Sequence, residues 1–138
     1  MGQHVQLVAA VGLLATVAAT AATVVIESFT ARPQGNAIVV EWRVSREEGV
    51  ARYEVERSHG NSQEFRTLTT VTPKGAPATY TYEDRDVLRP TAPEQRLYTY
   101  RIKIVGKDGT TSYSPTVTVA YNTSGIRRTW GMIKEMFR

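Results

Sequence analysis

The clearest pattern in this chain is an alternation of apolar and polar residues in three segments. Between positions 38 and 44 every even residue is apolar, and two of the three odd residues are charged. Segments 53–57 and 98–104 repeat the alternation, with Glu, Thr, Arg and Lys between the apolar positions. A period of two residues indicates β-strands with one face in a core and the other in water. The core is therefore expected to include Trp42, Tyr53, Val55, Tyr98, Tyr100 and Ile102.

Shorter segments complete an all-β pattern. Further strands are expected at 65–71, 79–83 and 116–121, and a first strand is expected to run through Val25 and Phe29. Residues that favour turns separate the strands at 33–36, 59–61, 73–75 and 107–109. Seven strands at roughly ten-residue spacing, without intervening helices, predict a seven-stranded antiparallel immunoglobulin-like sandwich over residues 24–121.

These strands resemble the fibronectin type III module, in particular the version common in exported bacterial proteins. The resemblance is carried by Trp42 on the second strand, by Tyr53-Glu54-Val55-Glu56-Arg57, and by Tyr98-Thr99-Tyr100-Arg101-Ile102-Lys103-Ile104. It covers about 95 of the 138 residues. It implies a corner hydrogen bond from Tyr98 to the connection before its strand. It supplies no catalytic residue, and the Arg-Gly-Asp tripeptide of some animal members is absent from this sequence.

Composition agrees with one domain. The chain has no cysteine, so aromatic packing rather than disulfides must stabilise its core. Its formal net charge is +4. Outside the last residues, positive and negative side chains are interspersed, as in 52–57, which is typical of a solvated strand face. We therefore expect no nucleic-acid partner.

The segment from Val5 to Ile26 is uncharged over 22 residues and rich in Ala, Val and Thr. As a helix it would be about 33 Å long, enough to cross the hydrocarbon core of a bilayer. Three interpretations stay open for residues 1–23: a cleaved signal peptide, a retained membrane anchor, or a buried soluble segment. Met1–His4 lacks the Lys or Arg that begins most signal peptides. Either of the first two interpretations places the sandwich outside the cytoplasm, as an extracellular, periplasmic or membrane-tethered protein.

Residues 122–138 predict a short basic amphipathic helix. Apolar residues recur at helical spacing, and the tail contains four of the 17 Lys and Arg but one of the 13 acidic residues. Such a helix could bind a protein partner, lie in a membrane interface, or pack on its own domain. The expected contact residues are Ile126, Arg127, Arg128, Trp130, Ile133, Lys134 and Phe137.

Candidates for chemistry are weak. His4 and His59 belong to no visible triad or metal set, since one flanks the apolar run and the other lies in an expected turn. The adjacent Glu47 and Glu48 lie in a turn-like stretch, where their side chains would diverge rather than share an acid–base site.

Acidic residues near the end of one expected strand could assist a calcium site, but a charged corner paired to Arg85 and Arg89 is the preferred interpretation. These residues are Glu83, Asp84 and Asp86. We expect no catalytic residue, no metal and no cofactor, and hence no enzyme.

The sequence therefore predicts a non-enzymatic protein-interaction module of the bacterial cell envelope or exterior. Its expected partner is an envelope protein, with membrane-surface contact and oligomer formation as further interactions. The alternative is a structural subunit of a larger membrane or filament assembly, which packs through residues 5–26 and 126–137.

Overall fold

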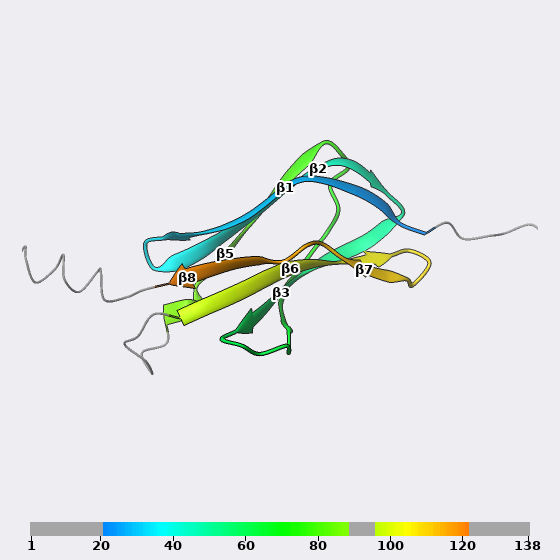
Figure 1. Ribbon diagram of the computed structural model, residues 1–138. Helices are drawn as coiled ribbons and strands as arrows, with labels where there is room; N and C mark the ends of the chain where they lie inside the picture. Colours follow the sequence, from blue (N-terminus) through cyan, green and yellow to red (C-terminus); the bar gives the residue numbers. More distant parts are fainter. Residues whose placement is uncertain (1–20, 89–95, 122–138) are drawn as a thin grey trace, which may run out of the picture.

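The computed structural model describes residues 21–88 and 96–121, and in these ranges the protein is almost entirely β-strand (Figure 1). One sheet has three strands in the order β1-β2-β5, and the other has the order β4-β3-β6-β7, with β8 also paired to β6. All pairs are antiparallel. The strands are β1 (Thr23–Gln34), β2 (Ala37–Glu48), β3 (Val50–His59), β4 (Arg66–Val71), β5 (Ala78–Asp84), β6 (Arg96–Gly106), β7 (Thr111–Tyr113) and β8 (Val117–Tyr121).

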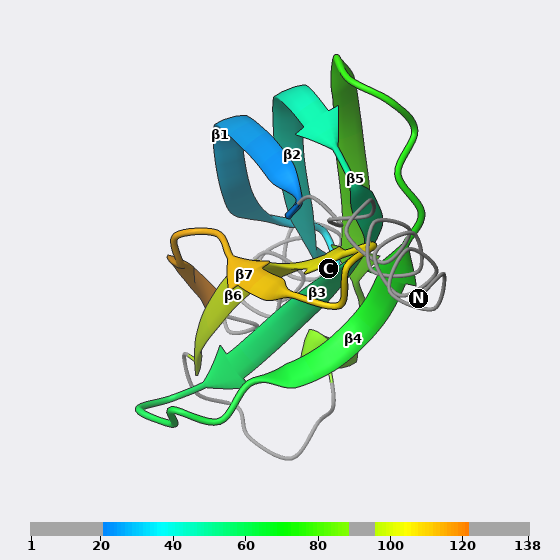
Figure 2. The same cartoon turned by 90° about the vertical axis from the view of Figure 1, so that its right-hand side faces the viewer.

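The two sheets lie face to face and enclose one core (Figures 1 and 2). The all-β class, the antiparallel pairing and the sandwich architecture expected from the alternation are thereby confirmed. A short 3₁₀ helix, η1 (Asp86–Leu88), follows β5 and was not expected.

The described residues form eight strands rather than the seven expected. The additional strand is β7, which is three residues long. Both β7 and β8 pair with β6, opposite Lys103–Val105 and Arg96–Tyr100 respectively, so they occupy successive parts of one sheet edge. Residues 114–116 interrupt this edge, and Pro115 within the interruption has no backbone N–H to donate.

Strand β2 follows the predicted pattern closely. Ile38, Val40, Trp42 and Val44 are completely buried, and Arg43 between them is exposed. The other side chains expected in the core are buried as well: Tyr53, Val55, Tyr98, Tyr100 and Ile102.

Three aromatic rings pack against one another in the core. The ring of Trp42 stacks on that of Tyr80 at 5.1 Å between centroids and meets Tyr53 edge-on at 6.0 Å. Tyr53 and Tyr80 are also in contact, at 5.1 Å. Because each ring comes from a different strand, the cluster joins β2, β3 and β5. Each fully buried aromatic side chain contributes about 1.5–3 kcal/mol through burial alone.

Two irregularities in the β1–β2 pair change which residues face inward. The register steps from Val25↔Arg46 to Ile26↔Val44, so Ser45 is an extra residue in β2, and Glu27 is correspondingly extra in β1. A β-bulge reverses the alternation beyond it. Glu47 therefore points toward the core side of the sheet, although the period of residues 38–44 would have placed it outside.

The predicted turns are confirmed where glycine is needed. Gly35, Gly60, Gly75 and Gly109 all have positive φ. Gly49 has a φ of 67° and joins β2 to β3 by a single residue, a connection that the turn pattern did not predict.

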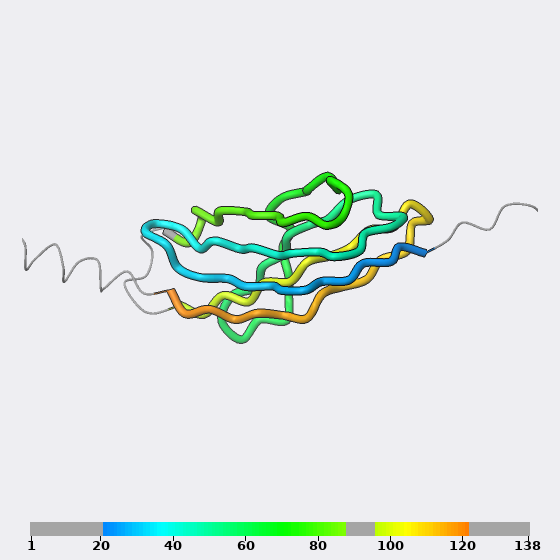
Figure 3. The backbone as a smooth tube through the Cα atoms, turned by 90° about the horizontal axis from the view of Figure 1, so that it is seen from above, coloured from blue at the N-terminus to red at the C-terminus, as the bar shows by residue number. Residues whose placement is uncertain are grey.

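The described chain enters and leaves the sandwich at opposite ends (Figure 3). At the first end, a Cβ atom added to Gly106 would lie 3.4 Å from the Cβ of Ala22. At the other end, Tyr121 pairs with Arg96 and donates a hydrogen bond to the carbonyl of Gly35 at 3.0 Å. Residues 96 and 106 are the first and last of β6, so the two ends are about 30 Å apart.

Several expectations fall on residues outside those described: most of the apolar segment 5–26, the connection that Tyr98 was expected to reach, and the basic tail 122–138. The last four residues of the apolar segment belong to β1 rather than to a helix. In ranges 21–88 and 96–121, no helix has both the length and the apolar character required to cross a bilayer.

Candidate interaction surface

A buried ion pair joins the two sheets near the end that contains Tyr121. Arg57 Nη1 lies 2.6 Å from Asp84 Oδ2, and the hydroxyl of Tyr100 donates to the same oxygen at 2.6 Å. The Asp84 side chain is 1% exposed. Burial and the bond to Asp84 raise the pKa of Tyr100 far above its usual value. Burial lowers the pKa of Arg57, but its bond to Asp84 outweighs this effect and raises it.

A second carboxylate, that of Glu47, joins the two sheets near the end of the sandwich opposite Tyr121. Glu47 accepts hydrogen bonds from the hydroxyls of Tyr53 at 2.5 Å and Tyr80 at 2.6 Å, and from the amide of Gly75 at 2.8 Å. Burial raises the pKa of Glu47, but these three bonds outweigh it and leave the pKa below its ordinary value. Burial and the bond to Glu47 raise the pKa of Tyr80 to about 12.

These contacts correct two expectations from the sequence. Glu47 and Glu48 lie in β2 rather than in a turn, and Glu48 forms an exposed ion pair with Arg46. Asp84 is committed to Arg57 rather than to a charged corner. The expected pair between Glu83 and Arg85 is confirmed at 2.7 Å.

The remaining candidates do not gather into a site. Glu83 and Asp86 are exposed, and the exposed His59 is the last residue of β3 and the first of the expected turn, since its carbonyl accepts from the amide of Ser62 at 3.2 Å. Within the described ranges, His, Asp and Glu side chains form no group of three that could hold a metal ion. His4 and Arg89 lie outside those ranges.

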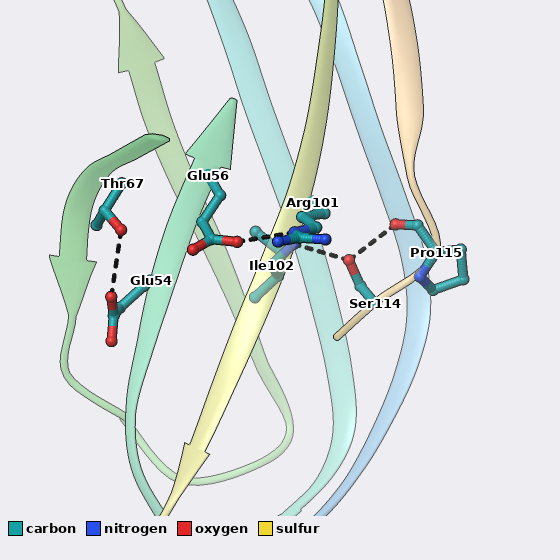
Figure 4. Close-up of polar contacts among 7 residues, drawn as sticks. All are labelled: Glu54, Glu56, Thr67, Arg101, Ile102, Ser114 and Pro115. Carbon is teal, nitrogen blue, oxygen red and sulfur yellow. Dashed lines mark hydrogen bonds and ion pairs between the residues drawn. The ribbon is translucent and has the colours of Figure 1, made fainter. Parts of the chain in front are cut away.

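The outer face of the five-stranded sheet has a more distinctive arrangement. The guanidinium of Arg101 lies between two aromatic rings, 3.9 Å from the centroid of Phe65 and 4.0 Å from that of Tyr113. Its Nε donates to Glu56 Oε1 at 2.7 Å, and the two side chains face each other across β3 and β6 (Figure 4). Arginine stacked on aromatic rings gains about 0.5–2 kcal/mol per contact and is held in one orientation.

Polar contacts also connect the strands on either side of β3 and β6. Thr67 of β4 donates to Glu54 of β3 at 3.4 Å (Figure 4). Across the interrupted edge, the amide of Ile102 donates to Ser114 Oγ at 2.8 Å, and Ser114 Oγ donates to the carbonyl of Pro115 at 2.8 Å.

Large apolar side chains are exposed at three described positions: Val25 at 42%, Leu97 at 46% and Tyr113 at 48%. Leu97 and Tyr113 both lie on the outer face of the five-stranded sheet. Leu97 is next to Tyr98, whose side chain is buried on the inner face, and Tyr113 pairs with Lys103, which is on the same face as Arg101. We call the set of Phe65, Leu97, Arg101 and Tyr113 the outer aromatic surface.

Sequence reasoning did not find this surface. The alternation predicted that Arg101 faces outward, but it could not show that Phe65 and Tyr113 approach it from segments about 36 and 12 positions away. Phe65 directly precedes β4 and Tyr113 lies in β7, so both rings reach Arg101 of β6 only through the pairing of strands, which the spacing in the sequence does not reveal. The contact residues that were expected instead, from Ile126 to Phe137, lie outside the described ranges.

Comparisons with known proteins are sparse. No family model and no curated protein matches the sequence. Among solved structures, the fold is similar to that of pectate lyase PelI from Erwinia chrysanthemi in complex with tetragalacturonic acid, with a TM-score of 0.51 and 18% identity. Pectate lyase Pel3 from Pectobacterium carotovorum aligns with a TM-score of 0.49 and 18% identity. The matches cover 67% and 66% of this chain but 27% and 26% of the lyase chains.

The expectation that this chain is not an enzyme is contradicted by the comparison with PelI, because that protein is a lyase. The sequence argument was that no triad or metal set is visible, and such an argument excludes only the site types that were sought. At 18% identity the likeness to PelI shows the fold alone. It is a likeness between this β-sandwich and about a quarter of a larger enzyme chain.

Proposed function

We propose that this chain is a fibronectin type III-like interaction module of an exported bacterial protein, and that it binds a protein partner of the cell envelope through the outer aromatic surface. The observation that carries the proposal is the exposure of Leu97 and Tyr113 on the same sheet face as the stacked Arg101. Tyrosine and arginine are enriched at the centres of protein interfaces, where they contribute most of the binding energy.

The strand order supports the fibronectin type III assignment. In constant-type immunoglobulin domains the fourth strand pairs with the fifth. Here β4 pairs with β3, and β5 forms the edge of the three-stranded sheet beside β2. With β7 and β8 counted as one interrupted strand, the sandwich has the seven strand positions expected from the sequence.

The rigidity of the surface favours binding. Arg101 is restrained by two rings and by Glu56, so little side-chain entropy remains to be lost when a partner docks. The basic tail is proposed as a second contact. Since the tail follows Tyr121 and residues 1–20 precede the described chain, a tether at residues 1–20 and a partner at residues 122–138 would attach at opposite ends of the sandwich.

The test is capture of envelope proteins on immobilised full-length chain. Tyr113→Ser and Leu97→Ser should each reduce the retention of a specific partner at least fivefold, about 1 kcal/mol. Val25→Ser is the matched control, because Val25 is equally exposed but lies on β1 of the other sheet. Equal retention by all three variants, measured again with the purified partner, would exclude this face as the binding surface.

A further inference from the structure

A shallow hollow opens on the outer face of the five-stranded sheet, where the β3–β4 connection folds over the strands. Its volume is about 380 Å³, at the lower end of the range for small-molecule sites. Residues from three parts of the chain line it: Ser58, Gly60, Asn61, Ser62, Gln63, Phe65, Thr99 and Thr116. Apart from Phe65 and Gly60, every one of these residues has an uncharged polar side chain.

A row of hydroxyl groups crosses the sheet at the hollow, and Ser58 and Thr99 of this row line it. Ser58, Thr99 and Thr118 pair directly across β3, β6 and β8, so their side chains lie on one face. The hydroxyls of Thr99 and Thr118 are 2.9 Å apart. Ser58 is 2% exposed, yet its hydroxyl has no hydrogen-bond partner among the described residues. Because Ser58 lines the hollow, its hydroxyl is available to a ligand that can both donate and accept.

The connection that forms the wall is held by its own backbone. The amide of Gly60 donates to the carbonyl of Leu97 at 3.0 Å, and the amide of Ser62 donates to the carbonyl of His59 at 3.2 Å. Ser62 Oγ accepts from the amide of Glu64 at 3.1 Å. The wall is thus shaped before any ligand arrives. The side-chain amides of Asn61 and Gln63 make no hydrogen bond within the described part of the chain.

The border of the hollow adds an aromatic ring and an ion pair. Phe65 lines the hollow and also contacts Arg101 at 3.9 Å. Arg101 and Glu56 occupy the next row of the sheet, with a donor and an acceptor 2.7 Å apart. No side chain in the lining is charged, so the hollow lacks the cations that a phosphate requires and the carboxylates that a metal ion requires.

We propose that this hollow binds one pyranose unit of a carbohydrate. Sugar hydroxyls are both donors and acceptors, which matches the hydroxyls of Ser58 and Thr99 and the amides of Asn61 and Gln63. The apolar C–H face of a pyranose ring matches the ring of Phe65. The proposal depends on the hollow itself and not on the protein-binding role proposed above. It adds a carbohydrate ligand to a module whose proposed partner is a protein.

The first experiment is a titration of the ¹⁵N-labelled full chain with glucose, galactose, N-acetylglucosamine, cellobiose and chitobiose, followed by NMR. At least one sugar should produce saturable shifts confined to the amides of the hollow, with a dissociation constant of about 1 mM. Glycerol is the control, because it has hydroxyls but no ring face. Shifts that fail to saturate with every sugar, or that glycerol reproduces, would overturn the proposal.

The second experiment uses two variants, of which Thr99→Val keeps the shape of the side chain and Gln63→Ala removes an amide from the wall. Thr99→Val removes one hydroxyl of the lining and should weaken binding of the sugar identified above about fivefold, the equivalent of one net hydrogen bond. Gln63→Ala should weaken it to a similar extent. The matched control is Thr81→Val, because Thr81 is exposed on β5 of the other sheet. Equal affinity of Thr99→Val, Gln63→Ala and the control would rule out the hollow as the sugar site.

Discussion

Asp84 and Glu47 are the residues whose structural roles are easiest to isolate, because each carboxylate is fixed by contacts to the opposite sheet. Asp84 of β5 meets Arg57 and Tyr100, and Glu47 of β2 meets Tyr53. A buried ion pair adds little net stability over an apolar pair, but removal of one partner is costly because the other charge stays buried.

Asp84→Asn should therefore lower the free energy of unfolding by about 3–5 kcal/mol, since the Arg57 side chain is only 11% exposed and would lose its counter-charge. Urea denaturation measures this loss. The control is Glu83→Gln, which breaks the exposed pair with Arg85 and should change stability by less than about 1 kcal/mol. Equal effects from the two variants would show that the buried pair is not a stabilising contact.

Glu47 should make the stability depend on pH in the acidic range. Its pKa in the folded protein lies below the ordinary value of 4.5, so folding favours the carboxylate. The resulting stabilisation is complete at a pH above the pKa of the unfolded chain and disappears as the pH falls through the folded pKa. The wild type should therefore exceed Glu47→Gln in unfolding free energy at neutral pH, and the difference should shrink below pH 4.5. A difference that does not vary with pH would assign the effect of the substitution to shape alone.

At the scale of elements, the interrupted edge formed by β7 and β8 depends on one side chain. Ser114 is 7% exposed, and its Oγ accepts from the amide of Ile102 where the strand pairing is broken. The Ser114 amide in turn donates to the carbonyl of Ile102 at 2.8 Å. The Ser114 hydroxyl thus accepts the hydrogen bond that the Ile102 amide would otherwise donate to a neighbouring strand. Pro115 helps to interrupt that strand.

Ser114→Ala should destabilise the domain by about 1–3 kcal/mol, because it leaves the Ile102 amide buried without a partner. Hydrogen exchange should show faster exchange of that amide, and thermal unfolding should show the loss of stability. Ser112→Ala, at an exposed position of β7, should have little effect on either measurement. If both serines behave alike, the interruption does not depend on this hydroxyl.

Strands with a long, regular alternation were predictable, and contacts between distant strands were not. The period of two residues identified β2, β3 and β6 because each buries one face along most of its length. It could not locate the extra residue Ser45 or the continuation of β2 to Glu48, and so Glu47 was expected in a turn-like stretch. It also missed β7, whose three residues are too few to show a period.

The same limit applies to the candidate surfaces. Arg57 and Asp84 are 27 positions apart, and Glu56 and Arg101 are 45 apart, so only the pairing of strands brings them together. The hollow beside Phe65 arises because a loop folds over an outward-facing strand. The residue types that give such a site its chemistry can be seen in the sequence. Which of these residues lie close together is known only from the fold.

For the whole molecule, the main feature is the separation of the two points where the described chain begins and ends. The chain contains no native cysteine, so a pair of spin labels can be placed without background. Labels at Ala21→Cys and Asn36→Cys, both exposed positions at opposite ends of β1, should be about 30–45 Å apart by pulsed electron paramagnetic resonance. A distance below about 20 Å would contradict the described path of β1.

That separation also determines how the domain responds to tension. A pull on Ala22 and Tyr121 acts along the strands rather than across them, since β1 begins at one end of the sandwich and β8 finishes at the other. The interstrand bonds of β1 with β2 and of β8 with β6 then carry the load together, in shear, instead of opening one at a time. A domain that is loaded in this geometry resists extension along its length.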